Sequence, residues 1–399
     1  MSANHWSPRT IDDLCTFSSG RGFGRNDWAK SGLPIIRIQH LNGSRDFDYF
    51  AGTPDPQWIV EPGELLFAWA GTQGVSFGPK IWLGPRGVLN QHIYRVRPRN
   101  RIDKNWLYFL LQVITSEIER KAHGFKSNLV HVRKSDIISR RCLIPPPPEQ
   151  KQIAKVVGCW DQAVREAERL LTLKRRLKRG LMQQLLTGHR RFPEFASQPW
   201  REVGIGDVLQ ETNRPVRLNP DAPYRLVSIR RRSGGFFDRE IRLGKQIGYP
   251  TLEQIHAGDF VIARRQVLHG AMATVIKQFH GAYVSNAYAI LVARDPTQLH
   301  LPFFNYVSQL PRLYHMAFRC SYGVAIEKMF FRLDWFLRER ISIPPSIAEQ
   351  QKITAVLATA DREIGLLEEQ LHALREQKKG LMQKLLTGQV RVSTGGSLE

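Results

Sequence analysis

Apolar residues recur at alternating spacings of four and three through two stretches of the chain, and this pattern predicts two long helices, each with a continuous apolar seam. The first runs from Glu149 to Leu186 and the second starts at Glu349. Prolines precede both stretches, and Gly188 and Gly388 follow them as helix stops. The seam positions that we expect to pair the helices or to dock partners are Ile153, Val157, Trp160, Leu171, Leu181, Leu185, Ile353, Leu357, Ile364, Leu371, Leu381 and Leu385.

The two helical stretches are copies of one another. Residues 149–188 match residues 349–388 without a gap, at 17 of 40 positions. A weaker echo precedes each helix, where Trp6 aligns with Trp200 and Pro62-Gly-Glu-Leu-Leu66 aligns with Ala257-Gly-Asp-Phe-Val261. The repeat predicts a first globular domain (1–145), a first helix (146–190), a second domain (191–343), a second helix (344–390) and a flexible tail (391–399).

Two details of the helices are also expected. Ser346 with Glu349 three residues later is a capping-box pattern. Gly180 and Gly380 lie inside the helical pattern, where glycine is unfavourable, so we expect close backbone contact or a break there.

Both globular parts combine short β-rich runs with a helical stretch. The runs are 33–38, 93–96, 224–229 and 283–292, and the helical stretches are 105–123 and 302–318. We therefore predict an α/β (α+β) fold, in which two mixed domains alternate with the two long helices.

The composition indicates a globular protein with a polyanionic partner. The 399 residues are 42% hydrophobic and 24% charged, which argues against disorder, and the net charge is +22. The sequence shows neither an apolar run of membrane-spanning length nor an apolar signal core in residues 1–10. We expect a cytoplasmic protein that binds nucleic acid rather than a membrane.

The sequence carries none of the common catalytic motifs. A P-loop, an HExxH helix, a strand followed by GxGxxG and the Pro-Pro-aromatic tetrapeptide of base-amino methyltransferases are all missing. The four cysteines are scattered without a CxxC pair, so neither a zinc site nor a disulfide framework is indicated. We expect no catalytic residue, metal or bound cofactor in this chain.

Basic and amide side chains instead suggest DNA contacts. Arginine suits phosphate and guanine, and asparagine and glutamine suit adenine. Arg95, Arg97, Arg99 and Arg101 alternate, as on one face of a strand. The candidate DNA-binding residues are Arg37, Gln39, His40, Gln73, Asn90, Gln91, His92, Lys126 and Asn128 in the first domain, and Arg230, Arg231, Arg232, Arg264, Arg265, Gln266, His269 and Asn286 in the second.

The motifs that open and close the helices resemble those of the specificity subunits of type I restriction-modification systems. The resemblance rests on Ile144-Pro-Pro-Pro-Pro-Glu-Gln-Lys-Gln-Ile153, on Ile343-Pro-Pro345 with Glu349-Gln-Gln-Lys-Ile353, and on the closing Gly-Leu-Met-Gln-x-Leu-Leu-Thr-Gly. It implies a non-catalytic reader of double-stranded DNA, whose domains each read half of a bipartite target. The helices would pair antiparallel, set the spacer and dock two methyltransferase subunits.

The resemblance also implies that cofactors belong to the partners. S-adenosylmethionine would come with the methyltransferase subunits, and ATP and Mg²⁺ with the restriction subunits that act as translocases. Three alternatives remain open at this point: a specificity subunit for a fused nuclease-methyltransferase, a self-contained methyltransferase or nuclease, and a coiled-coil scaffold whose charge is incidental.

Overall fold

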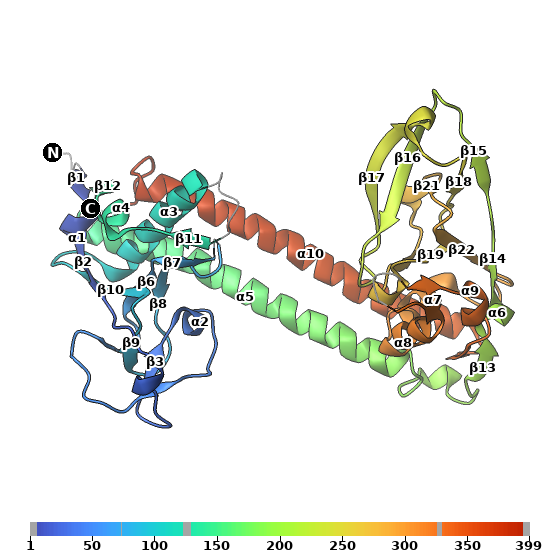
Figure 1. The fold of residues 1–399 in the computed structure, drawn as a ribbon, viewed down its shortest axis with the longest axis horizontal. Helices are drawn as coiled ribbons and strands as arrows, with labels where there is room; N and C mark the ends of the chain where they lie inside the picture. The colour runs from blue at the N-terminus through green and yellow to red at the C-terminus, as the bar shows by residue number, and fades with distance from the viewer. Residues whose placement is uncertain (1–5, 73, 123–128, 325–328, 394–399) are drawn as a thin grey trace, which may run out of the picture. The chain divides into compact units, whose positions relative to one another are not determined.

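The computed structural model describes residues 6–72, 74–122, 129–324 and 329–393, which form two compact units. The first unit comprises Met1–Glu168 and Glu369–Glu399, and the second comprises Arg169–Glu368. Two long helices, α5 (Pro147–Leu185) and α10 (Ile347–Leu386), contribute to both units (Figure 1). Each unit therefore contains one globular domain, the start of one helix and the end of the other.

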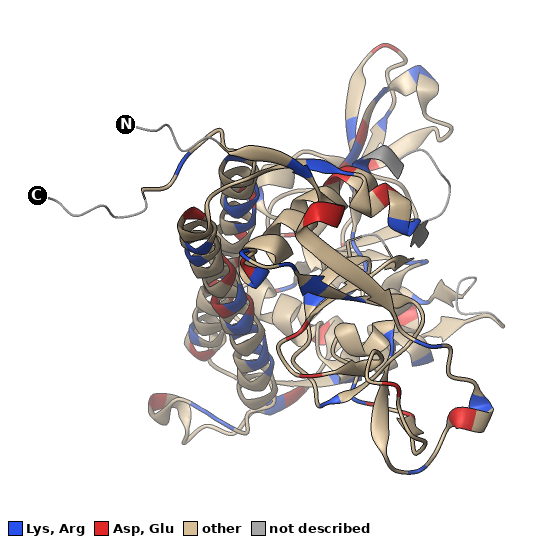
Figure 2. Cartoon of the chain, turned by 90° about the vertical axis from the view of Figure 1, so that its left-hand side faces the viewer, with Lys and Arg blue, Asp and Glu red and all other residues tan. Residues whose placement is uncertain are grey.

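The two helices pair antiparallel within each unit. In the first unit Arg375 of α10 lies 2.6 Å from Glu168 of α5. In the second unit Lys174 lies 2.7 Å from Glu363, and oppositely charged residues line both helices (Figure 2). The seam lies inside: Ile153, Val157, Leu171, Leu185, Ile353, Leu357, Leu371 and Leu385 are buried, and Trp160, Leu181, Ile364 and Leu381 are half-buried. The predicted antiparallel helix pair is confirmed.

The first domain is built on two four-stranded sheets. The proximal sheet has the order β2-β10-β6-β8 and the distal sheet the order β4-β3-β9-β5. The elements are β1 (Ser7–Thr10), α1 (Ile11–Leu14), β2 (Cys15–Ser19), η1 (Arg25–Asp27), β3 (Leu33–Ile36), α2 (Ile38–Leu41), β4 (Tyr49–Phe50), β5 (Ile59–Val60), β6 (Leu65–Ala68), β7 (Ala70–Thr72), β8 (Gly78–Ile81), β9 (Gly87–Leu89), β10 (Ile93–Pro98), α3 (Lys104–Ala122), β11 (Leu129–His131), α4 (Lys134–Ile138) and β12 (Arg141–Ile144).

The second domain repeats the proximal sheet and changes the distal one. The orders are β14-β22-β19-β20 and β15-β18-β21-β16-β17. The elements are η2 (Pro193–Phe195), β13 (Arg201–Gly204), α6 (Ile205–Val208), β14 (Leu209–Glu211), β15 (Pro215–Arg217), β16 (Pro223–Ile229), β17 (Phe236–Leu243), η3 (Gly244–Gln246), β18 (Thr251–Gln254), β19 (Phe260–Ala263), η4 (Val267–His269), β20 (Met272–Thr274), η5 (Lys277–Phe279), β21 (Tyr283–Val284), β22 (Tyr288–Ala293), α7 (Leu301–Val307), α8 (Pro311–Arg319), β23 (Ser321–Tyr322), β24 (Phe330–Phe331), α9 (Leu333–Phe336) and β25 (Arg340–Ile343).

The core of each unit includes the end of the helix that began in the other unit. Met382, Leu385 and Leu386 of α10 pack with the first domain's residues, such as Trp106 and Leu110. At the equivalent positions of α5, Met182, Leu185 and Leu186 pack into the second domain's core. Each proximal sheet and the paired helices therefore share one hydrophobic core, and the distal sheet lies on the far side of the domain from the helices (Figure 1).

Three sequence predictions about these elements are wrong in detail. The stretch 302–318 is two helices, because Pro311 lacks the backbone N–H that a continuous helix would use and starts α8 instead. The run 283–292 is two strands, β21 and β22, separated by a turn at 285–287. The four alternating arginines do not share a strand face, since β10 ends at Pro98 and Arg101 has a left-handed backbone (φ +68°).

The two helix glycines also differ from expectation. Helices α5 and α10 continue through Gly180 and Gly380, and a Cβ at either position would have no neighbour within 4 Å. Glu349 binds Arg191 and Trp200 with its carboxylate, so it does not serve the capping box that the spacing predicted. The predicted stops hold: Gly188 and Gly388 have φ values of +74° and +75°.

The open space around the helix glycines gives a stability prediction. Gly180→Ala and Gly380→Ala should each stabilise the protein by about 1 kcal/mol, because alanine restricts the unfolded chain and fits the helix. Chemical denaturation would measure this. The matched control is Gly188→Ala, which should destabilise, since its backbone is left-handed and a Cβ would lie 3.3 Å from Trp200. A loss of stability in both helix variants would contradict the prediction.

Candidate nucleic-acid interface

We call the proximal sheet of each unit, together with the paired helices, the frame. A buried carboxylate holds the frame of the first unit together. Glu149, in the first turn of α5, accepts hydrogen bonds from the Trp6 indole (3.0 Å) and from Nε and Nη2 of Arg391 (2.6 and 2.7 Å). Burial disfavours the charged form, but the bonds from Arg391 and Trp6 outweigh this effect and lower the pKa of Glu149. The carboxylate thus joins the start of α5 to the segments before β1 and after α10.

The second unit repeats this arrangement at the equivalent positions. Glu349 accepts bonds from Nε and Nη2 of Arg191 (2.9 and 2.8 Å) and from the Trp200 indole (3.4 Å). Hydrogen bonding to Glu349 raises the pKa of Arg191. The next residue repeats too, since Gln150 and Gln350 each donate to a proline carbonyl of the preceding segment and accept a backbone N–H of the domain.

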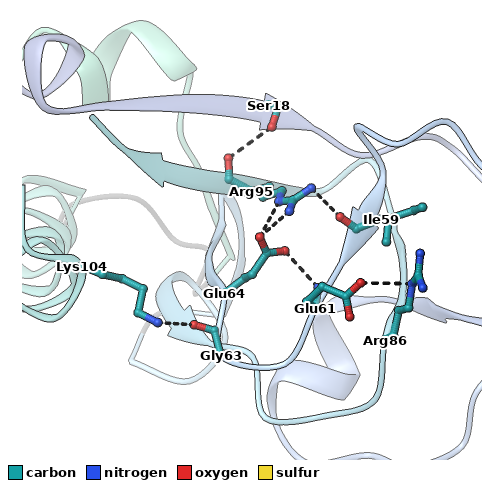
Figure 3. A network of polar contacts seen from close by, with 8 residues as sticks. All are labelled: Ser18, Ile59, Glu61, Gly63, Glu64, Arg86, Arg95 and Lys104. Atoms are coloured by element: carbon teal, nitrogen blue, oxygen red, sulfur yellow. Dashed lines mark hydrogen bonds and ion pairs between the residues drawn. The ribbon is translucent and has the colours of Figure 1, made fainter. Parts of the chain in front are cut away.

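In each unit a second acidic residue takes part in contacts that link the distal sheet to the proximal sheet. In the first unit the Glu64 carboxylate pairs with the buried Arg95 and accepts the Glu61 N–H, while Arg95 donates to the Ile59 carbonyl of β5 (Figure 3). In the second unit Asp259, which aligns with Glu64, pairs with Arg214 at 2.7 and 3.0 Å. Arg95 therefore has a structural partner and is not presented to solvent as the strand pattern suggested.

The parallel strands of the first distal sheet bring most of the predicted first-domain residues to one edge. Strands β3 and β9 run parallel, so their carboxyl ends lie side by side. The segment Arg37–His40 follows β3, Asn90–His92 follows β9, and Asn90 donates its N–H to the Ile36 carbonyl (3.0 Å). The other predicted residues of this domain, Gln73, Lys126 and Asn128, lie outside the described residues.

The side chains at this edge are not equally accessible to a ligand. His40 is buried: one ring nitrogen accepts the Arg37 N–H (2.8 Å) and the other lies 2.8 Å from the Asp46 carbonyl. Asn90 is also buried, and Arg37 pairs with Asp48 and stacks on Trp28. His92 is half-buried, and Gln39 and Gln91 are exposed. His40 therefore shapes the loop, contrary to the sequence expectation of a base contact.

The second distal sheet uses the same design. Strands β16 and β21 run parallel, so Arg230–Arg232 and Asn286 emerge at one edge. Three loops meet there, 230–235, 264–270 and 285–287, which we call the tip loops. The Arg232 N–H donates to the His269 carbonyl (2.5 Å), and the Arg264 N–H donates to the Ala287 carbonyl (2.9 Å). All eight predicted second-domain residues lie in the tip loops.

Four of the five arginines of the tip loops fall into two groups. Arg264 is paired with Glu211 at 2.5 Å, and its side chain is only 20% exposed. Arg230 lies over the Phe237 ring and donates to the Phe236 carbonyl (3.2 Å). In contrast, Arg232 and Arg265 are exposed, and the described part of the chain holds no polar partner for either guanidinium. Arg264 is thus mainly structural, whereas Arg232 and Arg265 are available to a ligand.

Sequence reasoning missed the residues that hold these surfaces in place. Arg191 and Arg391 obey the same 200-residue offset as the helix repeat, and Trp6 and Trp200 were aligned in the weaker echo. Extending the repeat search beyond Gly188 and Gly388 would therefore have indicated the two buried clusters. Nothing in the sequence would have indicated that Tyr314 lies against the tip loops.

The described ranges contain no group of three or more His, Cys, Asp or Glu side chains placed to hold a metal ion. Nor does any helix within them combine the length and the apolar character that crossing a membrane requires.

The chain is similar in sequence and in fold to a known class of protein. Residues 4–172 match the sequence model of the type I restriction modification DNA specificity domain. The chain is 22% identical to the type I restriction enzyme MjaVIII specificity subunit of Methanocaldococcus jannaschii, covering 86% of this chain and 83% of that one. It is also 22% identical to the putative MjaX specificity subunit of the same organism, over 98% and 94%.

Solved structures agree in fold. The specificity subunit from M. genitalium superposes with a TM-score of 0.58 at 14% identity, covering 97% of both chains. A chain from a study of complex assembly in a type I restriction-modification system gives 0.57 at 16% identity, covering 97% and 99%. The resemblance of the chain to the specificity subunits of type I restriction-modification systems is thus confirmed.

The two carboxylate clusters predict unequal costs of mutation. Glu349→Gln should destabilise the protein by about 3 kcal/mol, because Arg191 is only 14% exposed and would be left as a buried charge. Glu149→Gln should cost only about 1 to 2 kcal/mol, because Arg391 is 46% exposed and can regain water. Denaturation of both variants checks the order, and an equal or reversed order would contradict it.

The lowered pKa of Glu149 also predicts a dependence on pH. The stabilisation from its charged form is complete above the ordinary value of 4.5 and is lost as the pH falls through the lower folded value. The stability difference between wild type and Glu149→Gln should therefore shrink below about pH 4.5. Thermal unfolding between pH 3 and 7 measures it, and a difference that grows on acidification would refute the assignment.

Proposed function

We propose that this chain is the DNA-reading subunit of a type I restriction-modification complex and that each distal edge reads one half of a bipartite target. The chain itself carries no catalytic role. Its partners would be two methyltransferase subunits, which use S-adenosylmethionine, and restriction subunits, which use ATP and Mg²⁺.

The proposal rests on one observation: the two units share the same frame but carry different distal sheets. The proximal sheets share their strand order, and the Glu149 and Glu349 clusters share their bonding. The distal sheets have four and five strands, and different side chains stand at their edges. Two equivalent supports with unlike reading edges suit a target whose two halves differ in sequence.

The helix pair offers a face for a partner. Leu170, Leu173 and Leu177 are exposed along one stripe of α5, at 44%, 50% and 54%, outside the buried seam. Exposed leucines at spacings of three and four form an apolar surface that a partner helix can cover. We assign methyltransferase docking to this stripe rather than to the seam positions, most of which are buried within the chain.

The alternatives make different predictions. A specificity subunit for a fused nuclease-methyltransferase would have a gene for that fused enzyme beside its own. A self-contained enzyme would methylate or cut DNA unaided. A scaffold would lose all DNA preference once salt suppresses phosphate contacts.

Methylome sequencing tests the proposal directly. A host that expresses this chain with its methyltransferase subunit should show methylation in one bipartite motif, and a host that expresses either subunit alone should show none. Methylation by the purified chain alone, or methylation without a motif, would reject the proposed function.

The tip loops supply a test at the level of residues. Arg232→Ala and Arg265→Ala should each weaken binding of the complex by about 1 to 3 kcal/mol where a base is read, or lower the salt slope by about 1 where a phosphate is touched. Arg264→Ala is the matched control, since it should mainly affect stability through Glu211. Changes should map to one half of the target. Unchanged affinity and salt slope in both test variants would place the reading edge elsewhere.

The helix pair can be tested as a spacer. Inserting one heptad after Glu168 in α5 and one after Leu371 in α10 adds about 10 Å to each helix while keeping the seam in phase. We expect the same half-sites, separated by about three more base pairs of about 3.4 Å each. The control inserts a heptad in α5 alone, which takes pairs such as Lys174–Glu363 out of register and should abolish methylation. An unchanged spacer in the double insertion would show that the helices do not set the distance.

A further inference from the structure

The turn between β16 and β17 has a strained backbone. Arg232 and Ser233 both have left-handed conformations (φ +57° and +54°), although neither is glycine. Two consecutive left-handed residues with side chains are unfavourable, so they persist only where the surroundings impose them. Such strain is often found where a side chain must be held for a ligand.

The neighbouring loop and one tyrosine impose this conformation. The N–H groups of Arg232 and Ser233 donate to the carbonyls of His269 (2.5 Å) and Gly270 (2.8 Å). The hydroxyl of Tyr314, from α8, lies 2.7 Å from the Ser233 hydroxyl. Its ring lies against Gly270, where an added Cβ would come within 2.3 Å of it. Tyr314 therefore contacts both loops that carry the arginines.

The consequence is a fixed presentation of two arginines. Arg232 lies within the strained turn, and Arg265 lies in the loop to which that turn is hydrogen-bonded. Both side chains are exposed. A phosphate contact tolerates movement of the guanidinium, but bidentate recognition of a base edge requires a defined position and direction.

We propose that Tyr314 is a positioning residue for sequence specificity, which acts through Ser233 on the arginines of the tip loops without contacting DNA itself. This inference rests on the proposed function. Tyr314 contributes to discrimination between bases in the half of the target that the second domain reads. It does not set the overall affinity for DNA.

The test is Tyr314→Phe, which removes one hydroxyl and keeps the ring against Gly270. The complex of the full chain with its methyltransferase subunit is measured on its cognate duplex and on duplexes with one changed base pair. We expect discrimination in the second domain's half-site to fall about tenfold, within the range for one bidentate contact. Discrimination in the other half-site and the salt slope of binding should stay at wild-type values.

Two further variants separate positioning from a general loss of structure. Ser233→Ala removes the same hydrogen bond from the other side and should have the same effect, and the double variant should add little to either. Tyr249→Phe changes an exposed tyrosine and should have no effect. Unchanged discrimination in Tyr314→Phe, an equal loss in both half-sites, or additive effects in the double variant would each overturn the inference. A wild-type complex without base discrimination would instead reject the proposed function.

Discussion

The burial of one carboxylate at the start of each long helix is the interaction on which the rest of the structure depends. A lone charge at such a position would be costly, so Glu149 and Glu349 each require an arginine and hold it in a fixed place. The partners come from far along the chain: Arg391 is 242 residues from Glu149, and Arg191 is 158 from Glu349. Each contact joins the start of one helix to the segment that follows the other.

This constraint makes the two units depend on both helices. The last turns of α10 lie in the core of the first unit and those of α5 in the core of the second. The first unit therefore needs residues from both ends of the chain before its core is complete. Contacts of such high sequence separation carry a large loop-closure cost, which the apolar seam and the interhelical ion pairs offset together.

The division between a constant frame and variable tips also follows from burial. Frame residues such as Glu349 and Gln350 are enclosed by neighbours, so a change at one position disturbs several bonds. The tip loops lie at one edge of the second domain's distal sheet, where Arg230, Arg231, Arg232, Arg265, Gln266 and Asn286 are exposed. Acidic residues at equivalent positions, Glu64 and Asp259, attach two quite different sheets to the same kind of support. Loops on a rigid scaffold can change their ligand without changing the fold.

The sequence by itself determined the features that are local or periodic. A seam that repeats every seven residues specified both helices to within a few residues, and the 200-residue offset established the duplication. The sequence also placed the arginine clusters directly after strands, because the residues that indicate a strand and those that indicate the turn ending it are adjacent. Proline and glycine marked the helix ends for the same reason.

Only the tertiary structure decided which of these side chains are accessible to a ligand. His40 and Arg264 look like ligand-binding residues in the sequence, but His40 is bonded within its own loop to Arg37 and Asp46, and Arg264 pairs with Glu211 from a distant segment. Gly180 and Gly380 suggested a break, yet their surroundings are open. Tyr314 carries no signal in the sequence and gains its position because α8 packs against the tip loops. The partners of Arg264 and Tyr314 lie 53 and 81 residues away along the chain, and such contacts exist only in the folded protein.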